Sequence, residues 1–119
     1  MKIHVVCSNY ESDRIIPRMF NALAQKAHFT ISDIPDDSAD VNYFSLYLDF
    51  PKEGYSKTRT AALFSHKETG VKSKLDKWDN VAKQVNLRLT WSKLYYDDLM
   101  QYGETKIVTP FIDLEMFNL

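Results

Sequence analysis

The sequence predicts an α/β fold, a Rossmann-like three-layer sandwich with a mainly parallel, doubly wound sheet. Short apolar runs recur along the 119 residues, and amphipathic helical patterns separate several of them. Apolar runs without polar alternation are typical of strands that are buried on both faces. Helices between such strands provide the right-handed crossovers of a parallel sheet, with one helical layer on each face.

The first half of the chain predicts three strands and one helix. Residues 3–7 form a β-branched apolar run, which predicts the first strand. Pro17 fits the first turn of the helix that follows, because a missing N–H costs least there. Further strands are predicted at residues 28–31 and 41–47. Residues 44–58 fit a helix, a hairpin or a loop equally well, since Pro51, Gly54 and Ser56 punctuate them.

The second half predicts three more strands, at residues 60–64, 86–89 and 106–108. An apolar stripe along residues 71–85 predicts a helix that turns its lysines to solvent. Ser92 is the predicted N-cap of the next helix, and Gly103 suits the position just past its end.

Composition excludes several classes of protein. The formal charge of −1 gives no electrostatic footprint for nucleic acid or an anionic membrane. No stretch approaches the roughly 20 apolar residues of a transmembrane helix. Cys7, the one cysteine, excludes an internal disulfide and a multi-cysteine metal cluster. We therefore expect a cytoplasmic chain with no metal site, with Cys7 packed as a small hydrophobe.

Ligands of open parallel sheets bind at the carboxyl ends of the strands, which directs attention to the loops there. The loop after the first strand offers Ser8, Asn9 and Tyr10, convergent polar groups of the kind that carbohydrate recognition needs. The same loop fits a solvated turn that caps the following helix equally well. It contains no glycine, so it lacks the G-x-G-x-x-G fingerprint and NAD binding is not expected.

His66 follows the predicted strand at residues 60–64, with Ser65 before it and Glu68 two positions on. A histidine there could act as a general base or bind a hydroxyl or phosphate. The alternative is a partly exposed loop histidine, or one that caps the following helix. His4 and His28 lie in predicted strands, so we expect both to pack.

The remaining charged and aromatic groups predict structural roles. The carboxylates Asp97 and Asp98 are adjacent on a predicted helix and do not face each other, while Asp36 and Asp37 fall in a turn. The two tryptophans are expected in the core or at an interface.

Four passages of the second half carry a resemblance when they are taken in order. Residues 60–68, TAALFSHKE, are similar to a strand followed by (F/T)-H-x-E. Residues 78–86, WDNVAKQVN, are similar to W-x-x-A-x-x-(V/A)-D, and residues 90–95, TWSKLY, to x-M-S-x-x-Y. Residues 99–117 then follow L-x-x-x-G … K-(V/I)-x-V-I-P-P-G-(I/V)-D-x-x-x-F, with Phe111 in place of the glycine. This series, which covers about half the chain, resembles the N-terminal half of GT-B-type glycosyltransferases.

The resemblance implies a domain that binds mainly the acceptor in an enzyme that transfers a sugar from a nucleotide-sugar to an acceptor hydroxyl. It implies His66 near the reacting centre, and an acceptor contacted by Ser8, Asn9, Tyr10 and Ser92, beside Ser65 and Glu68. Residues 1–110 would be this domain and residues 111–119 the start of an interdomain linker. No cofactor is expected here, because the family binds the nucleotide-sugar in its C-terminal half.

The sequence stops where that second half should start, so we expect a truncated enzyme and no transferase activity from this chain alone. The partners expected are an acceptor glycan or small-molecule acceptor and the missing donor-binding domain. The alternative function is a non-catalytic, single-domain α/β binding or interaction module. It predicts self-association through an exposed face near Phe111, Met116, Phe117 and Leu119.

Overall fold

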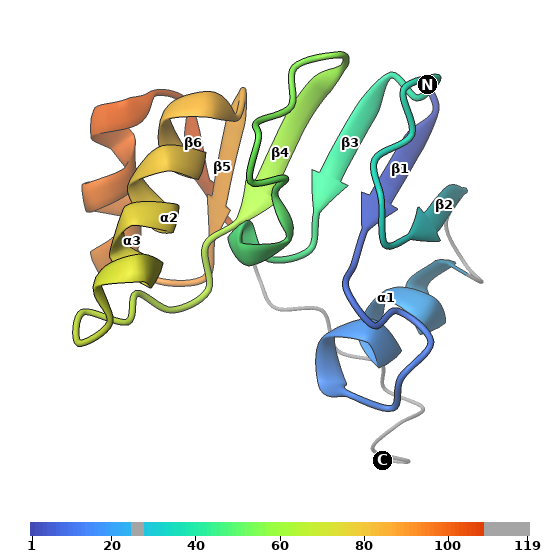
Figure 1. The fold of residues 1–119 in the computed structure, drawn as a ribbon, viewed down its shortest axis with the longest axis horizontal. Coiled ribbons are helices and arrows are strands. Elements are labelled where there is room, and N and C mark those ends of the chain that lie inside the picture. The colour runs from blue at the N-terminus through green and yellow to red at the C-terminus, as the bar shows by residue number, and fades with distance from the viewer. Residues whose placement is uncertain (25–27, 109–119) are drawn as a thin grey trace.

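The chain folds around one six-stranded sheet in which every neighbouring pair of strands is parallel (Figure 1). The computed structural model describes residues 1–24 and 28–108. The strand order is β2-β1-β3-β4-β5-β6. The strands are β1 (Ile3–Val6), β2 (Phe29–Ser32), β3 (Val41–Phe44), β4 (Arg59–Leu63), β5 (Leu87–Thr90) and β6 (Thr105–Ile107). The helices are α1 (Ile15–Ala24), α2 (Lys72–Gln84) and α3 (Lys93–Leu99), with short 3₁₀ turns η1 (Tyr47–Asp49) and η2 (Met100–Tyr102).

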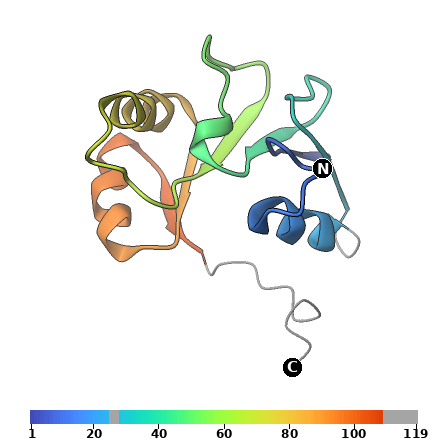
Figure 2. The same cartoon turned by 60° about the horizontal axis from the view of Figure 1, so that its bottom comes forward.

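The chain runs from β1 in both directions across the sheet, which confirms the predicted doubly wound sandwich. The β1-α1-β2 unit extends toward one edge, and β3 to β6 extend toward the other. Right-handed crossovers in opposite directions place their helices on opposite faces. Figure 2 shows α1 on one face of the sheet, and α2 and α3 on the other.

The structure differs most from the sequence-based expectation between residues 44 and 58. The third strand ends at Phe44, three residues earlier than predicted, because the chain then turns into η1, where Asp49 N–H bonds Leu46 O at 2.9 Å. No α-helix crosses over from β3 to β4. The chain past Val108 includes the predicted linker and its apolar residues, and these positions lie outside the described residues.

The main core lies between the sheet and α2. It contains three strand side chains, aromatic residues just past β4 and in the η1 region, the inner face of α2 and the last residue of α3. Its buried members are Val6, Phe44, Tyr47, Phe50, Ala62, Phe64, Trp78, Val81, Ala82, Val85 and Leu99. Phe64 and Trp78 are in edge contact with ring centroids 5.0 Å apart. Because each such side chain contributes about 1.5–3 kcal/mol on burial, this face supplies most of the hydrophobic stabilisation.

The opposite face holds a smaller cluster under α1. Val5, Cys7 and Phe20 are buried there, and Tyr43 packs against them with its ring 5.6 Å from that of Phe20. Cys7 is therefore a packed apolar side chain, as predicted.

Buried polar side chains fasten the amino ends of the strands to the neighbouring loops. Asn42 is fully buried, and its amide accepts from Asp36 N and donates to Asp36 O and to Thr58 Oγ1, each at 2.9 Å. Arg88 is 3 % exposed and donates to the carbonyls of Ala82 and Val85 at the end of α2, both at 2.7 Å. Burial lowers the pKa of Arg88.

Gly103 makes room for that arginine. Its φ of 145° is unfavourable for residues with a Cβ, and an added Cβ would lie 2.5 Å from Arg88 Nη2. The glycine predicted to end the third helix thus has a second role, since it lets the guanidinium reach its carbonyl partners.

Candidate functional site

A hollow of about 380 Å³ opens at the carboxyl ends of β1 and β3, the two strands between which the winding direction reverses. Ligands of open α/β sheets bind at such a switch point. We call this hollow the switch-point pocket; its lining residues are Cys7, Ser8, Asn9, Arg14, Ile15, Pro17, Ser45, Leu46, Leu48 and Asp49.

Asp49 is the polar centre of the switch-point pocket. Its Oδ1 accepts the hydroxyl of Ser8 at 2.6 Å, and its Oδ2 accepts that of Ser45 at 2.9 Å. The η1 turn carries Asp49, and Phe50 N–H closes that turn on Tyr47 O at 3.2 Å. Two segments that are distant in the sequence, the loop after β1 and residues 45–49, therefore meet at one carboxylate.

Asn9 shapes the loop after β1. Its φ of 56° places it in the left-handed region, which asparagine tolerates better than most residues. Ser12 N–H bonds Asn9 O at 2.8 Å, so the chain turns tightly toward α1. This turn brings both Ser8 and Asn9 to the wall of the switch-point pocket.

The start of α1 forms the opposite wall. Arg14 is exposed beside the pocket, and Ile15 begins the helix. The first turn of a helix carries partial positive charge, and Arg14 adds a full one. Pro17 is buried in this turn, in the position predicted for it, where it leaves no N–H unsatisfied. The pocket thus has an acidic side and a basic side.

Cys7 lines the same pocket but is 1 % exposed, and burial raises the pKa of its thiol. The thiolate is the reactive form of cysteine. Cys7 is therefore a wall residue at this site.

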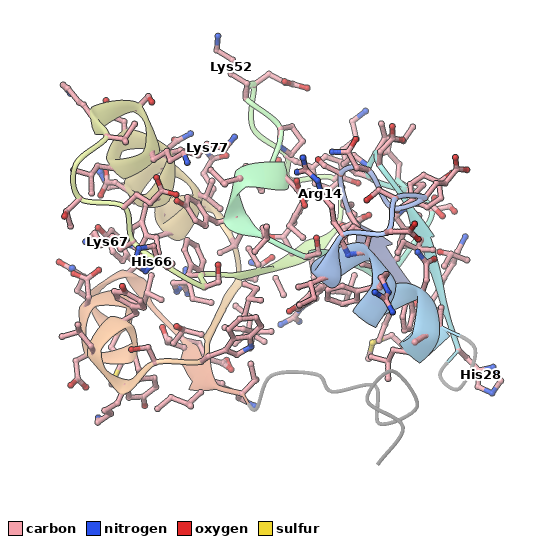
Figure 3. All side chains as sticks on the ribbon, turned by 90° about the horizontal axis from the view of Figure 1, so that it is seen from below. Arg14, His28, Lys52, His66, Lys67 and Lys77 are labelled. Carbon is pink, nitrogen blue, oxygen red and sulfur yellow. The ribbon has the colours of Figure 1, made fainter. Side chains whose placement is uncertain are left out.

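His66 stands at the carboxyl end of β4, where the sequence placed it, and it is exposed. Its Nδ1 lies 3.2 Å from the hydroxyl of Tyr95, whose ring packs edge-on against Trp78 at 5.4 Å. When the Tyr95 hydroxyl donates to Nδ1, the neutral imidazole carries its proton on Nε2. Figure 3 shows Arg14 on one side of η1, and His66 with Lys67 on the other.

The other residues predicted at the site are dispersed. Ser8 and Asn9 line the switch-point pocket, whereas Tyr10 packs against the cluster under α1. Ser65 is half-buried next to His66. Glu68 is paired with Lys74 at 2.8 Å, and Ser92 precedes α3 as predicted but makes no capping bond with its side chain.

Asp49 and Ser45 were not predicted from the sequence. They lie within residues 44–58, which fit a helix, a hairpin or a loop, so the turn that joins them was not predicted. The available signal was the spacing of Ser45 and Asp49, which a single turn brings together.

Most of the side chains for which the sequence predicts a structural role have one. His4 is buried, with Nδ1 2.6 Å from Thr30 Oγ1 and Nε2 2.9 Å from Ile34 O. His28 is exposed just before β2, so the prediction that it packs was wrong; the strand begins one residue later than expected (Figure 3). The aspartates of both adjacent pairs, Asp36 with Asp37 and Asp97 with Asp98, form ion pairs with lysines. An example is the pair between Lys67 and Asp98 at 3.1 Å.

Within residues 1–24 and 28–108, no group of three His, Cys, Asp or Glu side chains could hold a metal ion. The helices of the described part of the chain include none that is long and apolar enough to cross a membrane.

A larger hollow, of about 580 Å³, lies at the amino ends of the strands. Met1, Arg59, Asn86 and Glu104 are among its lining residues. Asn86 is engaged there, because its Oδ1 accepts from Thr60 N–H at 2.9 Å. Since parallel sheets bind ligands at their carboxyl ends, the switch-point pocket is the stronger candidate despite its smaller volume.

Comparison of the chain with models of protein families, with curated proteins and with solved structures gave no match. The fold and the site therefore provide the basis for a functional assignment.

Proposed function

We propose that this chain is the acceptor-side domain of a GT-B-type glycosyltransferase and that it binds a hydroxyl-rich acceptor in the switch-point pocket. The observation that carries the proposal is the Asp49 carboxylate, which already accepts two hydroxyl groups at the point where the sheet reverses its winding. The ordered resemblance along residues 60–117 supports the same class of enzyme.

An ionised carboxylate offers about four acceptor positions, and two serine hydroxyls occupy two of them. A sugar hydroxyl can take a remaining position or displace the Ser8 hydroxyl, whose residue is exposed. Asn9 adds an amide that both donates and accepts. The pocket volume of about 380 Å³ lies within the range of small-ligand sites.

Transfer requires an acceptor hydroxyl held beside the anomeric carbon of a donor, with its proton removed as the new bond forms. His66 provides a group that can bind a proton, and it also lies at the carboxyl ends of the strands. The Tyr95 hydroxyl, 3.2 Å from Nδ1, orients its imidazole ring. Family resemblance assigns the nucleotide-sugar to a second half of the enzyme. We therefore expect acceptor binding, but no turnover, from this chain alone.

Calorimetric titration with a panel of neutral saccharides (methyl glucoside, sucrose and lactose) tests the proposal. We expect at least one of them to bind with a millimolar or lower Kd, and we expect Asp49→Asn to weaken that binding tenfold or more. Asp76→Asn is the matched control, because Asp76 lies on the outer face of α2 in an exposed pair with Lys72.

Two outcomes would contradict the proposal. One is the absence of saccharide binding at any accessible concentration. The other is binding of UDP-glucose in preference to every saccharide, which would place the donor on this half. Turnover of UDP-glucose by this chain, abolished by His66→Ala, would contradict the expectation that a second half is required.

A further inference from the structure

Arg14 gives the switch-point pocket a positive charge that is available to a ligand. Its side chain is exposed and lines the pocket. The ion pairs formed within residues 1–24 and 28–108 do not include Arg14. Among the described residues that line the pocket, Arg14 is the basic one and Asp49 is the acidic one.

The two charged residues of the pocket do not pair with each other. The Asp49 carboxylate accepts the hydroxyls of Ser8 and Ser45, and the ion pairs of the described residues do not join it to Arg14. A ligand in the hollow can therefore meet a hydrogen-bond acceptor on one wall and a cation on the other.

The other two carboxylates of the loop after β1 leave the charge of Arg14 available. Glu11 and Asp13 are both exposed, and neither lines the switch-point pocket in the described part of the chain. Glu11 is engaged with the Tyr10 phenol, since a hydrogen bond with Glu11 raises the pKa of Tyr10.

Apolar side chains complete the lining. Ile15, Pro17, Leu46 and Leu48 belong to it, and Leu48 is 42 % exposed. The carbon-bound hydrogens of a sugar ring can pack on such a wall while the hydroxyls of the ring turn toward polar groups. An apolar lining with a few placed polar groups is typical of small-molecule sites.

We propose that the acceptor held by this pocket is a saccharide with one carboxylate, such as a uronic acid, and that Arg14 binds this carboxylate while Asp49 and Asn9 bind hydroxyl groups. The planar guanidinium presents paired N–H donors that match the two oxygens of a carboxylate. A phosphate monoester fits less well, because it is largely doubly charged at pH 7 and its second charge would face Asp49. The inference rests on the proposed function, since it names the class of acceptor for the same pocket.

Three ligands that differ only at carbon 6 test the inference by calorimetric titration: methyl glucoside, methyl glucuronide and methyl glucoside 6-phosphate. We expect the Kd of methyl glucuronide to be about tenfold lower than that of methyl glucoside, because charge-assisted hydrogen bonds are stronger than neutral ones. The 6-phosphate should bind more weakly than the glucuronide. Added salt should reduce the preference for the glucuronide, since exposed charges are screened.

Substitutions of Arg14 assign the preference to its side chain. Arg14→Gln should abolish the tenfold preference, and Arg14→Lys should keep only part of it, because an ammonium group lacks the planar pair of donors. Arg18→Gln is the matched control and should keep the full preference, because Arg18 is an exposed arginine of the same helix that does not line the pocket.

The results separate failure of the inference from failure of the proposed function. The inference alone is wrong if a neutral saccharide binds but methyl glucuronide binds no more tightly than methyl glucoside. It is also wrong if Arg14→Gln and Arg18→Gln change the preference equally, or if the 6-phosphate binds more tightly than the glucuronide. Both are wrong if no saccharide binds, neutral or charged.

Discussion

The two ends of the sheet are built from different kinds of polar contact. At the amino ends, Asn42 and Arg88 are buried, and each makes several hydrogen bonds, mostly to backbone groups of the neighbouring chain. At the carboxyl ends, Ser8 and His66 are exposed and each has a single side-chain partner, Asp49 and Tyr95 respectively. The buried bonds assign stability to the amino ends, and the proposed function assigns ligand binding to the carboxyl ends, so substitutions at each end should affect one property and leave the other nearly unchanged.

Arg88→Leu should have the largest effect on stability. It removes charged hydrogen bonds to the end of α2 and leaves the carbonyls of Ala82 and Val85 without these donors, which predicts a loss of about 3 kcal/mol or more. Urea unfolding followed by tryptophan fluorescence measures it. Arg59→Leu is the control, since Arg59 is exposed on β4. A cost below about 1 kcal/mol for Arg88→Leu would mean that the amino end is not the stabilising one.

Gly103→Ala should cost about 2–3 kcal/mol. Part of this is the positive φ and part is the displacement of the Arg88 guanidinium by the new methyl group. Gly70→Ala provides a matched comparison, because an added Cβ there meets nothing within 4 Å and its φ is not positive. Thermal unfolding of the two variants should therefore separate them clearly, and equal Tm values would contradict this role for Gly103.

Acid should weaken the amino end. Bonds from Lys2 and Ser38 hold the pKa of Asp36 well below its usual range, near 4 for an unfolded chain. A carboxyl with a lowered pKa stabilises the fold above its unfolded pKa, and this contribution is lost as pH falls through the lower, folded pKa. The free energy of unfolding should therefore decline below about pH 4, and Asp36→Asn should flatten that decline. An unchanged slope in the variant would assign the acid sensitivity to other groups.

His66→Ala should have the smallest effect on stability, within about 0.5 kcal/mol, because the side chain is exposed and bonds only Tyr95. Chemical denaturation checks this, and a cost above about 1 kcal/mol would give the carboxyl end a structural role. Tyr95→Phe isolates the hydroxyl; nitrogen shifts of His66 should then report a change in the balance between its two tautomers.

The sequence predicted the sheet, the helices and their order because apolar periodicity directly reflects which faces are buried. It predicted one wall of the switch-point pocket, since Ser8 and Asn9 follow a recognisable strand. It missed Asp49, whose position depends on a 3₁₀ turn formed between residues of mixed propensity. The burial of Arg88 was not predicted from the sequence either. Its partners are backbone carbonyls, which every residue type carries, so no sequence pattern indicates them.

Amide NMR of the labelled chain, titrated with the best-binding saccharide of the panel, tests the division between the two ends most directly. We predict that shift changes concentrate at residues 7–9, 14–15 and 45–49, around the switch-point pocket. Changes centred instead on residues 59–61, 86–87 and 104, around the larger hollow at the amino ends, would contradict the account.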